Sequence, residues 1–222
     1  MELLAPAGSK QALTAAVQSG ADAVYLGGPQ FGARYSAENF TIEEMKTWVD
    51  YCHLYGVDVH VTVNTLVKEK EIESLKEYLK QLNKIGVDAL IVQDMGAVEI
   101  IKKTVPDMTL HASTQMTVTS LEGVKYLEDM GFSRVVLARE LSEKEIEHIC
   151  KNAKAEIEVF VHGAICMCYS GQCLMSSILG GRSGNRGRCA QPCRLPYDLL
   201  ENGKTVKSGY VLSPKDMALV ND

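Results

Sequence analysis

The chain has 222 residues, of which 46% are hydrophobic and 23% are charged, and its formal net charge is -5 at pH 7. This composition is typical of a globular protein of one domain and excludes a disordered or fibrous chain. The negative charge argues against a surface that binds nucleic acid throughout, but it leaves room for a local basic patch.

Neither a secretory signal nor a membrane span is predicted. The start, MELLAPAGSKQAL, lacks the basic segment and long apolar run of a signal peptide, and no stretch approaches the roughly 18 apolar residues of a spanning helix. We therefore expect a cytoplasmic protein without membrane contact, whose cysteines stay mostly reduced.

Residues 1–163 alternate short β-branched runs with longer segments of helical period, which predicts a parallel α/β sheet. The predicted strands are 2–7, 23–27, 58–64, 89–93, 109–114, 134–139 and 157–163. The predicted helices are 9–20, 41–55, 69–85, 95–104, 118–130 and 142–153.

A weak repeat indicates the kind of sheet. GADAVYL, GVDVHVT, GVDALIV and GFSRVVL each place a glycine between a helix and a strand, where it can supply a left-handed C-cap. A βα unit that recurs about every 30 to 45 residues favours a TIM-like (β/α) barrel over a doubly wound sheet. No G-x-G-x-x-G follows the first strand, as a dinucleotide fold would require.

Residues 164–222 follow as a second part of the same domain: a Cys/Arg-rich loop, a β-hairpin around ENGK, and the beginning of a helix. Ser213 is the expected N-cap, Pro214 the first helical residue, and Asp216 lies in the first turn. Because an eight-stranded barrel needs one more parallel strand, we expect the chain to be truncated before the closing βα unit.

Polar residues follow several predicted strands, at the edge where such barrels carry their active sites. The candidate catalytic residues are His111, Gln115, Arg139, Glu140 and His162. Together they predict a pocket for a small molecule or a base. The alternative is structural: the histidines are ordinary rim residues, and the neighbouring Asn64 and Asp94 only cap helices.

Five of the seven cysteines lie between residues 162 and 194. Because the count is odd and the expected compartment is reducing, a disulfide framework is the weaker interpretation and a metal site the stronger one. Four of these thiols, arriving from two loops, suit zinc or an iron–sulfur cluster. Their irregular spacing favours a [4Fe–4S] cluster, with zinc as the alternative. The predicted ligands are Cys166, Cys173, Cys189 and Cys193.

The segment LGGRSGNRGR and the arginine after the last cysteine form a basic patch without a nearby acid. Arginine forks match phosphate geometry, and glycines let the backbone approach an anion. We therefore predict that Arg182, Arg186, Arg188 and Arg194 bind RNA phosphates or a carboxylated metabolite; the alternative is a solvated loop.

EVFVHGAICMCYSGQCLMSSILGGRSGNRGRCAQPCR, together with LLAPAGS, GADAVYLGG and LSPKDM, closely resembles the peptidase U32 family, the collagenase-like peptidases. The resemblance runs through essentially the whole chain. It implies either a protease or an iron–sulfur protein that supports hydroxylation of a tRNA uridine with prephenate as co-substrate, of an rRNA cytidine, or of a ubiquinone precursor.

By position, the resemblance implies the same four cysteines as cluster ligands, with Cys168 or a residue beyond the chain as the alternative fourth ligand. It leaves open a homo- or hetero-oligomer with a related protein. A protease finds little support, since neither H-E-x-x-H nor G-x-S-x-G is present. We therefore favour an RNA-modifying hydroxylation function, with a peptidase or a non-catalytic RNA-binding cluster protein as alternatives.

Overall fold

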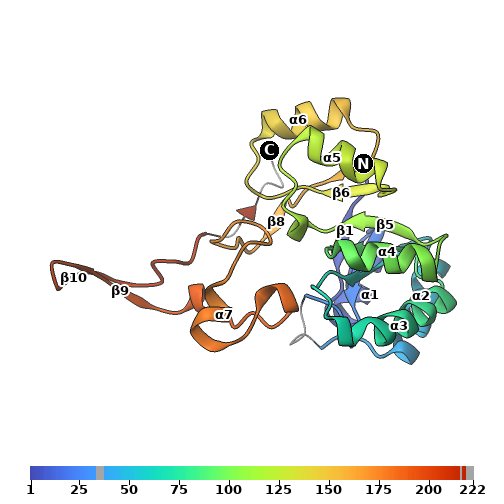
Figure 1. Ribbon diagram of the computed structural model, residues 1–222, viewed down its shortest axis with the longest axis horizontal. Coiled ribbons are helices and arrows are strands. Elements are labelled where there is room, and N and C mark those ends of the chain that lie inside the picture. Colours follow the sequence, from blue (N-terminus) through green and yellow to red (C-terminus); the bar gives the residue numbers. More distant parts are fainter. Residues whose placement is uncertain (34–37, 216, 219–222) are drawn as a thin grey trace.

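The computed structural model describes residues 1–33, 38–215 and 217–218. Seven parallel strands lie in chain order and curl into a half-barrel (Figure 1). They are β1 (Leu4–Pro6), β2 (Ala23–Gly27), β3 (Asp58–Val63), β4 (Ala89–Val92), β5 (Thr109–Ala112), β6 (Arg134–Val136) and β7 (Glu156–Glu158). The predicted TIM-like α/β fold is confirmed. In the part of the chain that the structure describes, β1 and β7 are the two edges of the sheet.

A helix connects each strand to the next, and the helices cover the outer face of the sheet (Figure 1). They are α1 (Lys10–Gln18), α2 (Ile42–Leu54), α3 (Ile72–Ile85), α4 (Met95–Thr104), α5 (Leu121–Asp129) and α6 (Glu143–Asn152). In α3 the predicted apolar face, including Leu75, Leu79 and Leu82, is fully buried against the strands.

The glycines of the weak repeat have the predicted role. Gly20, Gly56, Gly86 and Gly131 have φ angles of 86°, 71°, 84° and 82°, in the left-handed region. Each ends a helix and turns the chain into the next strand, because a residue with a Cβ is strained in that conformation.

The predicted strand over 157–163 is divided into two elements. β7 ends at Glu158, and His162–Gly163 form a separate short strand, β8, that pairs antiparallel with β11 (Met217–Ala218). The prediction of one continuous strand was wrong because the β-branched and aromatic residues of this segment give no sign of where the chain changes its pairing partner.

The predicted hairpin is confirmed. β9 (Tyr197–Glu201) and β10 (Lys204–Gly209) pair antiparallel around Asn202 and Gly203, whose φ angles are 50° and 75°. Positive φ at both turn residues is what the Asn-Gly sequence predicts.

The predicted helix at Ser213 is not formed. Arg194 Nη1 donates to Ser213 Oγ at 2.6 Å and to the Pro214 carbonyl at 3.4 Å. The hydroxyl of the predicted N-cap, Ser213, is therefore bound by Arg194. The chain then enters β11 instead of a helix. Asp216, the predicted first-turn residue, lies outside the described residues.

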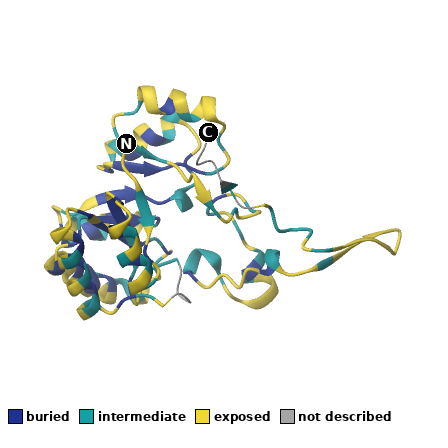
Figure 2. Cartoon of the chain, turned by 180° about the vertical axis from the view of Figure 1, so that it is seen from behind, coloured by how far each residue is buried: buried dark blue, intermediate teal, exposed yellow. Residues whose placement is uncertain are grey.

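Residues 164–194, which we call the cysteine segment, leave the sheet after β8 and include one short helix, α7 (Met175–Gly180). α7 and the β9–β10 hairpin extend away from the half-barrel (Figure 1). The hairpin is mostly exposed, whereas the strands of the sheet are largely buried (Figure 2). The core therefore lies between the sheet and its helices, and the cysteine segment is held by contacts with the strand ends.

Candidate functional site

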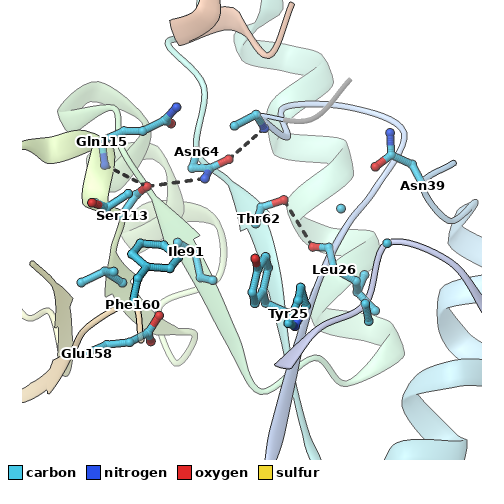
Figure 3. A pocket seen from close by; sticks show the side chains of 17 residues that line it. Tyr25, Leu26, Asn39, Thr62, Asn64, Ile91, Ser113, Gln115, Glu158 and Phe160 are labelled. Atoms are coloured by element: carbon cyan, nitrogen blue, oxygen red, sulfur yellow. Dashed lines mark hydrogen bonds between the residues drawn. The ribbon is translucent and has the colours of Figure 1, made fainter. Parts of the chain in front are cut away.

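A pocket of about 250 Å³ opens at the carboxyl edge of the sheet (Figure 3). Its apolar lining includes Tyr25, Leu26, Ile91, Val136 and Phe160. Its polar lining includes Thr62, Asn64, Ser113, Thr114, Gln115 and Glu158. These residues come from the inner face of the strands and from the loops that follow them, which is where barrels of this class carry ligands.

A chain of hydrogen bonds orients the polar side of the pocket. Ala33 N donates to Asn64 Oδ1 at 2.9 Å, and Asn64 Nδ2 donates to Ser113 Oγ at 3.5 Å (Figure 3). The backbone N–H of Gln115 donates to the same hydroxyl at 3.2 Å. Asn64 is therefore a pocket residue. The capping alternative is confirmed for Asp94, whose Oδ1 accepts from Ala97 N at 3.0 Å at the start of α4.

Two pocket residues carry buried oxygen atoms without a hydrogen-bond partner among the described residues. These atoms are Gln115 Oε1 and Glu158 Oε2. Burial raises the pKa of Glu158 to about 7, and this effect outweighs the opposing attraction of Arg134, whose Nη1 lies 3.7 Å from Glu158 Oε2. Gln115 was predicted from the sequence, whereas Glu158 was missed; its position at the end of a strand was the available signal.

The protonation of Glu158 should appear in the pH dependence of stability. Because the folded state holds this proton up to about pH 7 and the unfolded chain releases it near pH 4.5, stability is lost as the pH rises through this window. We expect the free energy of unfolding of the wild type, minus that of Glu158→Gln, to fall by about 3 kcal/mol between pH 4.5 and 7.5.

Urea unfolding of both proteins across that range measures this difference. The subtraction removes the contribution of the histidines, which both proteins share. A difference that does not change with pH would contradict the raised pKa.

His111 lies inside the half-barrel and is not among the residues that line the pocket. Its ring and that of His60 meet edge to face, with centroids 4.6 Å apart, and both side chains are buried. Burial, with smaller contributions from the nearby His60 and Arg134, lowers the pKa of His111 to about 3. His111 is therefore neutral near pH 7 and packs in the interior.

Arg134 occupies the interior beside these histidines and was not predicted as a site residue. Its Nη1 donates to Glu2 Oε1 at 2.6 Å, and its Nε donates to Glu156 Oε2 at 2.8 Å. The side chain is only 9% exposed. The sequence signal was a charged residue at the first position of an otherwise apolar strand.

The predicted pair Arg139 and Glu140 binds the cysteine segment. Arg139 Nε donates to Ser170 Oγ at 3.2 Å, and Ser170 N donates to Glu140 Oε1 at 3.0 Å. Ser170 is buried. Both predicted residues therefore position the cysteine segment against the end of β6.

The cysteine segment also binds the loop after β5. Thr117 Oγ1 donates to the Ser170 carbonyl at 2.7 Å, and Gln172 Nε2 donates to Thr117 Oγ1 at 2.9 Å. Gly171, with a φ of 72°, lies so close to this loop that an added Cβ would be 2.1 Å from the Gln115 carbonyl oxygen. The stretch between Cys168 and Cys173 is thus packed directly behind the pocket residue Gln115.

The cysteine thiols of the segment are free, and several of them influence one another's pKa. Burial raises the pKa of Cys193, and the Cys166, Cys189 and Cys173 thiols raise it further, while Arg194 lowers it. Burial also raises the pKa of Cys168, with a further contribution from Cys173. Gln191 N donates to Cys189 Sγ at 3.3 Å.

This donor set suits an iron–sulfur cluster in its chemistry, since thiolates are the cluster's usual ligands and backbone N–H groups commonly bind their sulfurs. In the described residues, no group of three or more His, Cys, Asp or Glu side chains is gathered closely enough to hold a single metal ion. Cys168 lies beside Cys173 and is a neighbour of the predicted ligands, so the choice of fourth ligand stays open.

The four arginines of the predicted basic patch have different positions. Arg186 forms a bidentate ion pair with Glu71, at 2.6 and 2.7 Å, and lowers the pKa of that carboxyl to about 2. Arg194 Nη2 donates to the Ile165 carbonyl at 2.8 Å. Arg194 thus connects the two ends of the cysteine segment, and Arg186 attaches this segment to the half-barrel. Arg182 and Arg188 are exposed, although Arg182 Nε donates to the Arg188 carbonyl at 3.2 Å.

His162, the last predicted catalytic residue, is exposed on β8 and does not line the pocket. The structure thus brings Gln115 into the pocket, places Arg139 and Glu140 behind it, and leaves His111 and His162 outside it. Within the described residues, no helix is both long and apolar enough to cross a bilayer.

These features define an α/β half-barrel with a pocket at its carboxyl edge and a cysteine-rich segment packed against the loops that line it. The model of peptidase family U32 matches residues 8–222, and the chain belongs to this family. It is also similar to a solved structure, the U32 peptidase Mk0906, with a TM-score of 0.62 and 20% identity over 74% of this chain and 70% of that one.

Two curated relatives are more similar in sequence. The 23S rRNA 5-hydroxycytidine C2501 synthase of Escherichia coli strain K12 is 45% identical over 97% of this chain and 33% of its own length. The tRNA hydroxylation protein P1 of Bacillus subtilis strain 168 is 40% identical over 99% of this chain and 54% of its own length. The chain therefore spans between a third and about half of these relatives.

Proposed function

We propose that this protein supports the hydroxylation of a pyrimidine base in RNA, with a tRNA uridine as the first candidate and prephenate as an anionic co-substrate. The observation that carries the proposal is the identity of 45% and 40%, over nearly the whole chain, to proteins named for rRNA and tRNA hydroxylation. Because the chain spans only part of those relatives, the activity is proposed for the full-length protein.

The proposal includes a [4Fe–4S] cluster held by Cys166, Cys173, Cys189 and Cys193, with Cys168 as the alternative fourth ligand. The mutual influence of the thiols on their pKa values and the Gln191 N–H bond to Cys189 support this ligand set. When bound, such a cluster supplies one-electron transfer. The hydrogen bond of Arg139 to Ser170 and the close packing of Gly171 on Gln115 attach the stretch between Cys168 and Cys173 to loops of the half-barrel, one of which carries the pocket residue Gln115.

RNA binding is proposed for the two exposed arginines, Arg182 and Arg188, since guanidinium groups pair with phosphates. Arg186 and Arg194 are not part of this proposal because their guanidinium groups already form hydrogen bonds within the protein. A peptidase function gains no support from Ser170: its hydroxyl is bound by Arg139, and its backbone N–H is bound by Glu140, so it lacks the histidine of a catalytic triad.

The cluster is tested by anaerobic purification of the full-length protein. We expect a coloured protein with ~4 iron atoms per chain, and Cys166→Ser and Cys189→Ser variants that lose most of the iron. Cys150→Ser, which changes an exposed thiol on α6, is the matched control and should keep it. A colourless protein that contains zinc would contradict the iron–sulfur proposal.

The reaction is tested in a deletion strain by mass spectrometry of tRNA and rRNA nucleosides. We expect one hydroxylated pyrimidine to disappear, and to return with the wild-type gene and the Cys150→Ser gene but not with Cys166→Ser. An unchanged nucleoside profile, combined with gelatin cleavage that one point mutation abolishes, would favour the peptidase alternative instead.

A further inference from the structure

The pocket described above has an unusual charge balance for a protein with a proposed anionic co-substrate. The described residues that line it include no Arg, Lys or His, and Glu158 is the only carboxyl group among them. Arg134, whose Nη1 lies 3.7 Å from Glu158 Oε2, is already bound by Glu2 and Glu156. Among the described residues, a carboxylate ligand would therefore lose its water without gaining a free counter-ion, which is strongly unfavourable.

The size and walls of the pocket favour one flat ring. Its volume of about 250 Å³ lies below the range of about 300–1,000 Å³ that is usual for drug-sized ligands. Tyr25 and Phe160 contribute aromatic rings, and Ile91 adds branched apolar surface (Figure 3). Val136 also lines the pocket. Aromatic and apolar walls of this kind hold the faces of nucleobases.

The polar groups offer a donor next to acceptors. Ser113 Oγ receives N–H donors from Asn64 and from the Gln115 backbone, so its own hydrogen is directed elsewhere and is available to a ligand. Gln115 Oε1 is a buried acceptor without a hydrogen-bond partner among the described residues. Glu158 Oε2 likewise makes no hydrogen bond within them, although Arg134 Nη1 lies 3.7 Å away. The edge of a pyrimidine carries carbonyl acceptors beside an N–H or NH₂ donor, and can satisfy both kinds of group.

We propose that this pocket binds a single uncharged pyrimidine ring, with its polar edge toward Ser113, Gln115 and Glu158, and that the anionic co-substrate does not bind there. The inference deepens the proposed function and rests on it for the RNA origin of the ring. It assigns these three side chains to the recognition of the base, and it separates the site of the base from any site for a carboxylate.

Binding of uridine, cytidine and prephenate to the full-length protein tests this inference, measured by saturation-transfer NMR and titration. We expect a nucleoside to bind, and its affinity to fall at least tenfold in Gln115→Leu and in Ser113→Ala. Gln11→Leu makes the same chemical change on the exposed face of α1 and should bind as the wild type does. Circular dichroism shows whether each variant is folded. If one variant fails to fold, the other still tests the inference.

Three results would overturn the inference: no binding of either nucleoside to the wild type, full affinity in both folded variants, or competition by prephenate for the nucleoside site.

Hydroxylation in cells is measured separately. Nucleoside binding without any RNA hydroxylation would end the proposed function but keep the pocket assignment. Full hydroxylation by both variants would end the pocket assignment but keep the function.

Discussion

Replacing Gly171 with alanine is expected to detach the cysteine segment from the half-barrel. The new Cβ would lie 2.1 Å from the Gln115 carbonyl oxygen, which is backbone and cannot rotate away, and the φ of 72° is itself strained for alanine. The two effects together should cost about 2–5 kcal/mol. This cost falls on the contact between Gly171 and the loop that carries Gln115, so we expect loss of the proposed cluster and of the proposed RNA hydroxylation.

Limited proteolysis and urea unfolding separate detachment from unfolding. In Gly171→Ala we expect rapid cleavage within residues 164–194, while the half-barrel stays folded. Gly180→Ala is the matched control, since Gly180 lies at the exposed end of α7, has no neighbour within 4 Å of an added Cβ, and has no positive φ. Equal protease resistance of Gly171→Ala and the wild type would show that this contact does not hold the segment.

Replacing Arg134 with methionine is expected to destabilise the half-barrel by about 3–5 kcal/mol at pH 8, because removal of one partner leaves buried carboxylates without a counter-charge. Glu158 is mostly buried and Glu2 is partly buried, with side chains 19% and 34% exposed. At pH 5 the cost should be smaller, since the orphaned carboxyl groups then take up protons.

Urea unfolding at both pH values measures this effect. Glu156→Gln is the control: its side chain is 66% exposed, so its loss should cost less than about 1 kcal/mol. The double variant Arg134→Met with Glu158→Gln should recover part of the stability lost at pH 8. A cost for Arg134→Met that is the same at pH 5 and pH 8 would show that uncompensated carboxylates are not its cause.

The strands and helices of the half-barrel follow from the sequence because they depend on local patterns. Apolar runs of β-branched residues predicted the buried strands, and the glycines after the helices predicted the left-handed C-caps. The Asn202–Gly203 turn is likewise a property of two adjacent residues. Gln115 could be placed in the pocket because its strand ends at the barrel's carboxyl edge.

Contacts between distant residues were not predictable in the same way. Arg186 meets Glu71 115 residues away, and Arg139 meets Ser170 31 residues away. A predicted phosphate-binding residue and a predicted catalytic residue thus both position the cysteine segment. The predicted helix at Ser213 fails because Arg194, 19 residues earlier, takes its cap.

The sequence by itself therefore determined the α/β half-barrel, the family resemblance and the grouping of the cysteines, since each depends on the order of neighbouring residues. Only the tertiary structure decided which polar groups line the pocket, which arginines are exposed, and that Glu158 holds its proton to about pH 7. The physical reason is that burial and partnership are set by residues far apart in the chain, and both control the charge and the hydrogen bonding of a side chain.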